Sequence, residues 1–245
     1  MGKEIKLFDE LEIWTHKHAI HFAAALILTG LIISGKNLPG PLGDFSEWLA
    51  YMLGTPASYF AEVLGFSPLE QGYSAYSLGV QVARIVHRLA GVGMAVIGLV
   101  WFLGELPRIK RWQIWPEGSL ITAVKDLVDY YTRRRKPRFG KYNLGQKLWT
   151  IGVVVGFTLL FVTGVIMWFR DIFSPELVNT AHILHAWLAW IGTAGLIIHV
   201  YLAIGIPEHR PTVKAIFRTG TAPEEFVKDH HPLYYEKISK SRGED

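Results

Sequence analysis

The stretch Leu148–Trp168, LWTIGVVVGFTLLFVTGVIMW, decides the class of fold. It contains no charged residue and no histidine. A transmembrane helix needs about 20 predominantly apolar residues, and this stretch is long enough. Three further apolar runs lie near residues 19–35, 78–104 and 178–207. Four such runs exceed what one soluble core needs in a chain of 245 residues. We therefore expect an all-α integral membrane protein, built as a four-helix transmembrane bundle.

The composition agrees with a membrane protein and restricts its chemistry. Half of the residues are hydrophobic and 19% are charged, whereas a typical soluble domain carries about 25% charged residues. The mean hydropathy is +0.23. The chain has ten histidines but no cysteine. This absence excludes disulfides, iron–sulfur clusters, thiolate zinc sites and covalent c-type haem, so any bound metal must rest on histidine, carboxylate or a weaker donor.

Basic residues predict the orientation of the four helices. The connection 36–77 has one basic residue, whereas the connection 105–147 has eleven, the tail after Gly205 has seven and the N-terminal arm has three. Cytoplasmic loops carry the excess of Lys and Arg, so we expect both termini on the cytoplasmic side of the inner membrane. The expected parts are a cytoplasmic arm (1–18), a transmembrane domain (19–207) with an outer loop (36–77) and a cytoplasmic amphipathic segment (105–147), and a cytoplasmic tail (208–245).

The segment before the basic run Arg133–Lys136 suits a membrane surface. Its apolar residues recur at helical spacing, which predicts an amphipathic helix on the inner surface or against a partner: Leu120, Val124, Leu127, Val128 and Tyr131. Positive-inside bias and attraction to anionic lipid account for the basic run, and nothing else indicates nucleic-acid binding. The N-terminal residues carry both signs of charge and no cleavage signal, so we expect the first helix to remain in the mature protein.

Four histidines are predicted to lie inside the membrane at two depths. His185 and His199 are fourteen residues apart on one helix, which places them about 21 Å apart along its axis and within about 40° of one another around it. The direction of each helix then places His87 beside His185 near the outer face. It also places His21 beside His199 near the inner face. Histidines from two facing helices at one depth suit bis-histidine ligation of haem iron.

Other interpretations of these residues stay open. A single histidine within a span also serves as a hydrogen-bonded contact between helices. Small residues flank the four histidines and leave room for a flat macrocycle, but ordinary helix packing favours them as well. Arg84 either neutralises a haem propionate or simply lies at the outer interface.

Several motifs together indicate a family. The run KYNLGQK lies directly before the third apolar helix, and KDHHPLYYEK lies in the tail. The segments HRLAG, HAWLA and HVYLA begin at His87, His185 and His199, and Ser34-Gly35 follows His21 by thirteen residues. With these motifs the chain resembles the cytochrome b (gamma) subunit of membrane-bound, quinone-reducing formate dehydrogenase, from its first helix to its C-terminal tail.

The resemblance implies specific ligands. It implies two haem b groups, the outer one held by His87 and His185 and the inner one by His21 and His199. It also implies a menaquinone-type site near His199, formed by Asn143 and Gly145. An asparagine amide and a backbone group can hydrogen-bond a quinone carbonyl, although these two residues taken alone predict only a turn leading into the third helix.

The resemblance also implies partner subunits. These are an iron–sulfur (beta) subunit and a molybdenum or tungsten catalytic subunit that oxidises formate, whereas this chain performs no formate chemistry itself. The sequence departs from the family pattern in its longer first outer connection and in Phe226, where tryptophan is more usual. The catalytic partner therefore stays open, and the alternative is a cytochrome b subunit of a hydrogenase or other molybdopterin oxidoreductase.

Three hypotheses for function follow from the sequence. In the first, electrons from the outer iron–sulfur subunit pass through two b haems to a quinone, which is reduced near the cytoplasmic side. In the second, the same histidines line a proton or metal transporter, a function that more often requires carboxylates within the spans or broken helices. In the third, the chain is a passive anchor that has lost haem.

Overall fold

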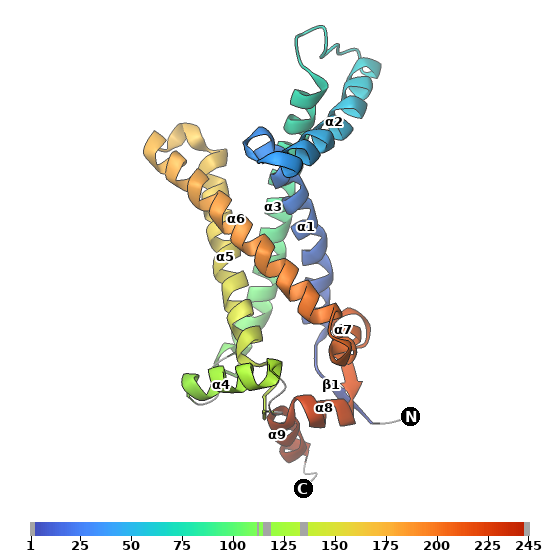
Figure 1. Cartoon of the computed structure of the whole chain (residues 1–245), viewed down its shortest axis with the longest axis vertical. Helices are drawn as coiled ribbons and strands as arrows, with labels where there is room; N and C mark the ends of the chain where they lie inside the picture. The colour runs from blue at the N-terminus through green and yellow to red at the C-terminus, as the bar shows by residue number, and fades with distance from the viewer. Residues whose placement is uncertain (1–2, 112, 115–118, 133–136, 243–245) are drawn as a thin grey trace. The chain divides into compact units, whose positions relative to one another are not determined.

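The computed structural model describes residues 3–111, 113–114, 119–132 and 137–242. Within these ranges four helices are long and apolar enough to cross a membrane: Glu10–Ser34, Ala75–Ile109, Leu144–Trp168 and Pro175–Ile204. At most 17% of the most apolar window of any of them is buried. Their apolar side chains therefore face outward, as lipid-facing side chains do. The prediction of an all-α membrane protein with four spans is confirmed, and one pair of short strands is the only sheet among the described residues (Figure 1).

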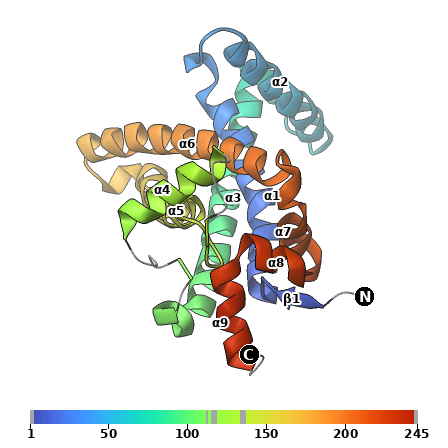
Figure 2. The ribbon, with the colours of Figure 1, turned by 60° about the horizontal axis from the view of Figure 1, so that its bottom comes forward.

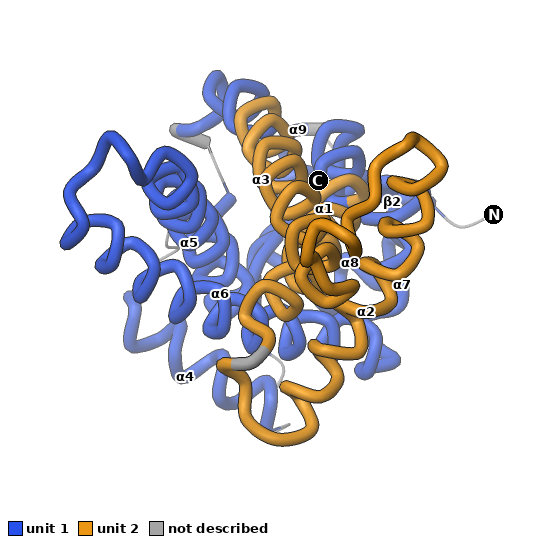
Figure 3. Tube along the Cα trace, turned by 90° about the horizontal axis from the view of Figure 1, so that it is seen from above, with its two compact units in different colours: residues 1–16, 101–245 blue, residues 17–100 orange. Residues whose placement is uncertain are grey.

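The chain divides into two compact units, coloured separately in Figure 3. Unit 2 is residues 17–100, and unit 1 is residues 1–16 with residues 101–245. The helices α1 (Glu10–Ser34) and α3 (Ala75–Glu105) each run through a boundary between the units. The two units are described one at a time below.

In unit 2, the predicted outer loop 36–77 contains a helix that the sequence did not suggest. A 3-10 turn (Gly35–Asn37) leads into α2 (Gly40–Val63), and α2 crosses α3 with the two backbones in contact. A Cβ atom on Gly54 would lie 1.6 Å from the Ala75 carbonyl oxygen, and one on Gly79 would lie 1.8 Å from that of Ala50. Only glycine permits this approach, which is typical of helices that pack through small residues.

In unit 1, α5 (Leu144–Trp168) and α6 (Pro175–Ile204) form an antiparallel hairpin, joined by a 3-10 turn at Arg170–Ile172 (Figure 1). Ser174 caps α6 by accepting a hydrogen bond from the Leu177 amide, and Pro175 occupies the first helical position. The predicted amphipathic helix is α4 (Leu120–Tyr131), which follows a 3-10 segment (Leu106–Arg111) and lies across the start of α5. The basic run 133–136 lies outside the described residues.

The start of α1 lies well before the predicted span at residue 19. Asp9 accepts a hydrogen bond from the Glu12 amide at 2.9 Å, and the Glu12 carboxylate accepts one from the Asp9 amide at 2.9 Å. This reciprocal capping box begins the helix at Glu10. Burial alone would raise the pKa of Asp9, but the Glu12 amide and Arg108, 2.6 Å away, lower the pKa overall. The charged form therefore holds the cap.

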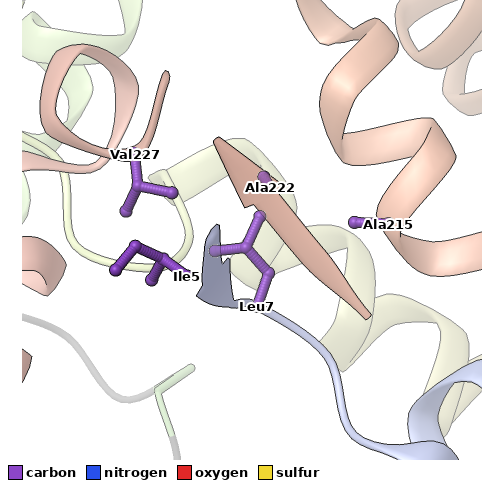
Figure 4. Close-up of a cluster of buried hydrophobic side chains, with 5 residues drawn as sticks. All are labelled: Ile5, Leu7, Ala215, Ala222 and Val227. Carbon is purple, nitrogen blue, oxygen red and sulfur yellow. The ribbon is translucent and has the colours of Figure 1, made fainter. Parts of the chain in front are cut away.

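The two ends of the chain meet in a small sheet within unit 1. Strand β1 (Glu4–Lys6) pairs antiparallel with β2 (Thr221–Pro223), with Ile5 opposite Ala222. The sheet covers a buried apolar cluster, drawn in Figure 4: Ile5, Leu7, Ala215, Ala222 and Val227. The C-terminal elements around it are a 3-10 turn (Pro207–His209), α7 (Arg210–Lys214), a π-helical turn (Ala215–Thr219), α8 (Glu224–His230) and α9 (Pro232–Arg242) (Figure 2). The predicted arm and tail thus contact one another directly.

Candidate functional site

The exposure of the histidines along the spanning helices separates them into two groups. His18, His21 and His182 are exposed. The half-buried histidines are His16, His87, His185 and His199. Three of these four are predicted haem ligands, whereas His16 is not; the predicted ligand His21 is exposed. Each half-buried ring has a distinct set of neighbours.

His199 on α6 lies in an aromatic cluster within unit 1. The Trp149 ring of α5 stacks on it, with centroids 5.0 Å apart and planes 11° apart. The His16 ring approaches it edge-on at 6.4 Å, and Phe217 contacts His16 at 5.2 Å. Gly195, one turn before His199, leaves room for the tryptophan, because a Cβ there would lie 2.7 Å from the Trp149 ring.

Within unit 1, the geometry favours His16 as the α1 partner of His199, whereas the sequence predicted His21. His16 is the histidine of α1 that lies beside His199, whereas the exposed His21 ring has Nδ1 2.7 Å from the Lys17 carbonyl oxygen of its own helix. Five residues of helix separate these histidines by about 7.5 Å and about 140° around the axis, so they face different sides. The sequence prediction placed the start of this helix near Ala19, whereas α1 begins at Glu10. The Asp9–Glu12 capping box is the sequence signal that puts His16 well inside α1.

His87 and His185 each have a threonine hydroxyl beside Nδ1, each within its own unit. Within unit 2, His87 Nδ1 lies 2.9 Å from the hydroxyl oxygen of Thr29 on α1. Within unit 1, His185 Nδ1 lies 2.9 Å from the hydroxyl oxygen of Thr163 on α5. Both threonines are buried, at 6% exposure each. The sequence analysis did not single out either threonine, and the pairing of His87 with His185 stays a prediction.

Asn143 and Gly145 lie where α4 meets the start of α5. Asn143 caps α5: its Oδ1 accepts from the Gln146 amide at 2.9 Å, and Gln146 Oε1 accepts from the Asn143 amide at 2.9 Å. The Tyr131 hydroxyl is hydrogen-bonded to the Asn143 side chain; burial raises the pKa of Tyr131, and this bond opposes the rise. A Cβ on Gly145 would lie 3.5 Å from Leu127. Asn143 and Gly145 thus form the predicted turn that leads into the third span, and their role in quinone binding stays a prediction.

The residues before Asn143 connect the start of α5 to α1. Lys141 Nζ lies 2.9 Å from Glu12 Oε1, and the Tyr142 hydroxyl donates to the same oxygen at 3.1 Å. Burial, reinforced by the Glu12 charge, raises the pKa of Tyr142 well above its usual value, so the hydroxyl stays protonated as a donor. The motif KYNLGQK thus combines an ion pair to α1 with a helix cap.

Two further features bear on binding. Arg84 is exposed on α3, one turn before His87, and its predicted contact with a propionate is not tested by this placement. A pocket of about 440 Å³ follows His199 along α6, lined by Ala203, Ile204, Arg210, Val213, Lys214, Phe217 and Arg218. Among the described residues, no three His, Asp or Glu side chains gather as ligands of a single metal ion.

Comparison with known proteins identifies the family. The profile described as prokaryotic cytochrome b561 matches residues 7–219. The chain belongs to the prokaryotic cytochrome b561 family. It is 28% identical over 211 residues to the formate dehydrogenase cytochrome b556 subunit of Haemophilus influenzae, covering 82% of this chain and 73% of the relative. It is 27% identical over 168 residues to the nitrate-inducible formate dehydrogenase cytochrome b556(Fdn) subunit of Escherichia coli K12, covering 66% and 73%. The predicted resemblance to such a subunit is confirmed.

The half-buried histidines of this cytochrome b561 family member fit haem b. A metal–imidazole bond is about 2.0 Å long, and the bonded nitrogen lies about 1.1 Å from the centre of its ring. Two imidazoles that bind one metal ion from opposite sides therefore have ring centroids about 6 Å apart. His16 and His199 are 6.4 Å apart. Haem b needs no covalent link to the protein, which agrees with the absence of cysteine.

Proposed function

We propose that this cytochrome b carries electrons across the inner membrane from an outer iron–sulfur subunit of a formate dehydrogenase to a quinone. The distance between the His16 and His199 rings carries the proposal. These two imidazoles come from different helices, and their separation suits two ligands of one haem iron. The names of the matching relatives support formate dehydrogenase as the complex. The absence of cysteine requires every iron–sulfur cluster to belong to a partner subunit, and a molybdenum or tungsten subunit would supply the formate chemistry.

The proposed ligands are four histidines in two pairs. His87 and His185 hold the outer haem b, and His199 holds the inner one together with His16 in place of His21. Haem iron supplies one-electron exchange when bound. The helices hold the imidazoles in position. Arg84 remains the candidate cation for an outer propionate.

The proposed quinone site lies at the cytoplasmic start of α5. Asn143 precedes Trp149 by six residues, about 9 Å along the helix, and Trp149 stacks on His199. The Asn143 amide nitrogen carries two hydrogens, of which Tyr131 takes at most one, so this group can donate to a quinone carbonyl. Gly145 keeps the adjacent backbone accessible, and protons for a menaquinone-type substrate would come from the cytoplasm.

The charge distribution supports the proposed orientation. Both termini and the connection 105–147 carry most of the basic residues, which favours the cytoplasmic side for them. The exposed apolar residues of α4 suit the inner lipid surface: Leu120, Ile121, Val124 and Val128. Membership of a cytochrome b family favours electron transfer over the histidine-lined transporter. The relatives favour formate dehydrogenase over a hydrogenase as the complex.

Haem counting in matched variants tests the proposal. The purified complex should contain two haem b per chain, with a reduced-minus-oxidised b-type spectrum. His16→Ala should reduce the count to one and abolish quinone reduction, while the outer haem remains reducible by the partner. His21→Ala, the matched control on the same helix, should retain both haems. Loss of haem in His21→Ala but not in His16→Ala would reverse the inner assignment, and a wild-type complex without haem would refute the function.

A further inference from the structure

The two histidines proposed for the outer haem are supported by the same dipeptide on two different helices. Thr29-Gly30 on α1 contacts His87, and Thr163-Gly164 on α5 contacts His185. The Oγ1–Nδ1 distance is 2.9 Å in both pairs. The two threonines lie 58 and 22 residues before their histidines, so local sequence does not impose the repetition.

The direction of each hydrogen bond follows from what the threonine hydroxyl already does. Thr29 Oγ1 lies 2.5 Å from the Ala25 carbonyl oxygen, and Thr163 Oγ1 lies 2.7 Å from the Leu159 carbonyl oxygen. A hydroxyl has one hydrogen and two lone pairs, so a hydroxyl that donates to its own helix accepts from any further partner. The imidazole Nδ1–H is therefore the donor to threonine.

The glycine after each threonine brings the histidine ring close to the helix. A Cβ on Gly30 would lie 3.7 Å from His87 Cε1, and one on Gly164 would lie 3.5 Å from His185 Cε1. These are ordinary contact distances for a Cβ, so a longer side chain would push the ring away. Threonine and glycine together contact the Nδ1–Cε1 edge of each imidazole ring. This contact sets the tautomer of the ring and its rotation about the side-chain bonds.

We propose that Thr29 and Thr163 are positioning residues for the outer haem: by accepting from Nδ1–H of His87 and His185, each keeps the lone pair of its imidazole on Nε2 for iron. This inference rests on the proposed function for the pairing of the two histidines. A hydrogen bond at the nitrogen remote from the metal fixes the tautomer and raises the basicity of the ligand. A more basic imidazole stabilises ferric over ferrous iron, so each threonine lowers the reduction potential of the haem.

The inner pair is supported by aromatic rings rather than by threonine. Trp149 stacks on His199, and Phe217 contacts His16 edge-on. The loss of a threonine hydroxyl should therefore change only one of the two haems. That selectivity makes the proposal measurable in a single redox titration.

Valine and serine variants of the complex isolate the hydroxyl group. Thr29→Val and Thr163→Val keep the shape and lose the hydroxyl acceptor, while the Leu26 backbone bond of His87 remains. Thr29→Ser and Thr163→Ser keep the hydroxyl acceptor. Thr158→Val on α5 is the matched control, because Thr158 donates to the Val154 carbonyl oxygen at 2.7 Å in the same way but is exposed. The readouts are haem content, the low-spin EPR spectrum and the midpoint potential of each haem.

We expect each valine variant to raise the potential of one and the same haem. Loss of such a partner typically weakens metal binding about 10- to 100-fold, and a tenfold change in the ferric-to-ferrous affinity ratio is about 59 mV for one electron. The serine variants should restore the wild-type value, and Thr158→Val should leave it unchanged. Selective loss of that haem in the valine variants alone would equally support the proposal.

Three results distinguish failure of this inference from failure of the proposed function. Two haems with unchanged potentials and EPR spectra in both valine variants would overturn it. Serine variants that behave like the valine variants would also overturn it, because packing rather than the hydrogen bond would then matter. If Thr29→Val and Thr163→Val shifted different haems, the positioning role would stand while the pairing of His87 with His185 would fall.

Discussion

Acidification should release the C-terminal tail from the start of α5, and His231 should be the group that responds. Its Nδ1 donates to the Gly140 carbonyl oxygen at 3.1 Å, directly beside the KYNLGQK motif. Burial is the main cause that lowers the pKa of His231 from 6.5 to about 4, against the opposing effect of the Gly140 bond. In the docked tail the His231 imidazole is therefore neutral. In the released tail it takes up a proton as the pH falls through its usual pKa of 6.5.

The sign and size follow from proton linkage. Because the pKa of His231 is lowered in the docked tail, its contribution to docking is fully present above pH 6.5 and is lost as the pH falls toward 4. The shift is worth at most about 3.4 kcal/mol, and the part lost between pH 7.5 and pH 4.5 is about 2.5 kcal/mol. This corresponds to about a 70-fold rise in the equilibrium constant for tail opening.

Amide hydrogen exchange measures this opening directly. The Leu233 amide donates to the Phe139 carbonyl oxygen at 3.1 Å, and the Tyr235 amide donates to the His231 carbonyl oxygen at 2.9 Å. After correction for intrinsic exchange rates, the protection of both amides should fall about 70-fold between the two pH values.

Two variants test whether His231 is responsible. His231→Asn keeps a donor near the Nδ1 position and cannot titrate, so its protection should be nearly independent of pH over this range. His230→Asn, at the neighbouring position, should retain the wild-type dependence. An unchanged fall in His231→Asn would refute the argument, because another group would then be the proton acceptor.

Further predictions concern packing and the start of α5. Gly79→Ala should force α2 from α3 at a cost of about 1–3 kcal/mol, seen as faster proteolysis of residues 36–77, whereas Gly91→Ala should not, because no atom lies within 4 Å of a Cβ there. Asn143→Ala should lose about 1 kcal/mol of capping and slow quinone reduction, whereas Asn143→Asp should keep the cap and the thermal midpoint but still slow quinone reduction; normal turnover in Asn143→Asp would remove the amide from the site. Lys141→Met should lower the thermal midpoint of the complex by leaving Glu12 partly buried without its cation, a loss of about 1–3 kcal/mol, and an unchanged midpoint would contradict this.

The spans could be predicted because their signal is local. Leu148–Trp168 is apolar throughout, and any chain with such a segment must satisfy its backbone internally as a helix in lipid. The strands β1 and β2 could not be predicted, because each has three residues and they are more than two hundred positions apart. Helix α2 was missed since the Gly and Pro residues of the connection 36–77 favour turns, whereas here Pro39 precedes the helix and Gly54 lies where α2 crosses α3.

The ligand roles of the candidate histidines stay predictions. His87, His185 and His199 are half-buried, and the helix start that brings His16 beside His199 depends on a cap at Asp9. Thr163 lies in the most apolar span, where nothing in the local pattern distinguishes it from Thr158. Only the packing of α5 against α6 brings His185 into hydrogen-bond distance of Thr163 and leaves Thr158 exposed.

The sequence by itself determined the membrane class, the four spans and the exclusion of thiolate metal chemistry, because hydropathy and composition can be read without the fold. The tertiary structure decided that His16 lies beside His199 and which threonine hydroxyls contact His87 and His185. The physical reason is helix rotation: one residue changes the direction of a side chain by about 100°, and only caps and interhelical contacts set that angle.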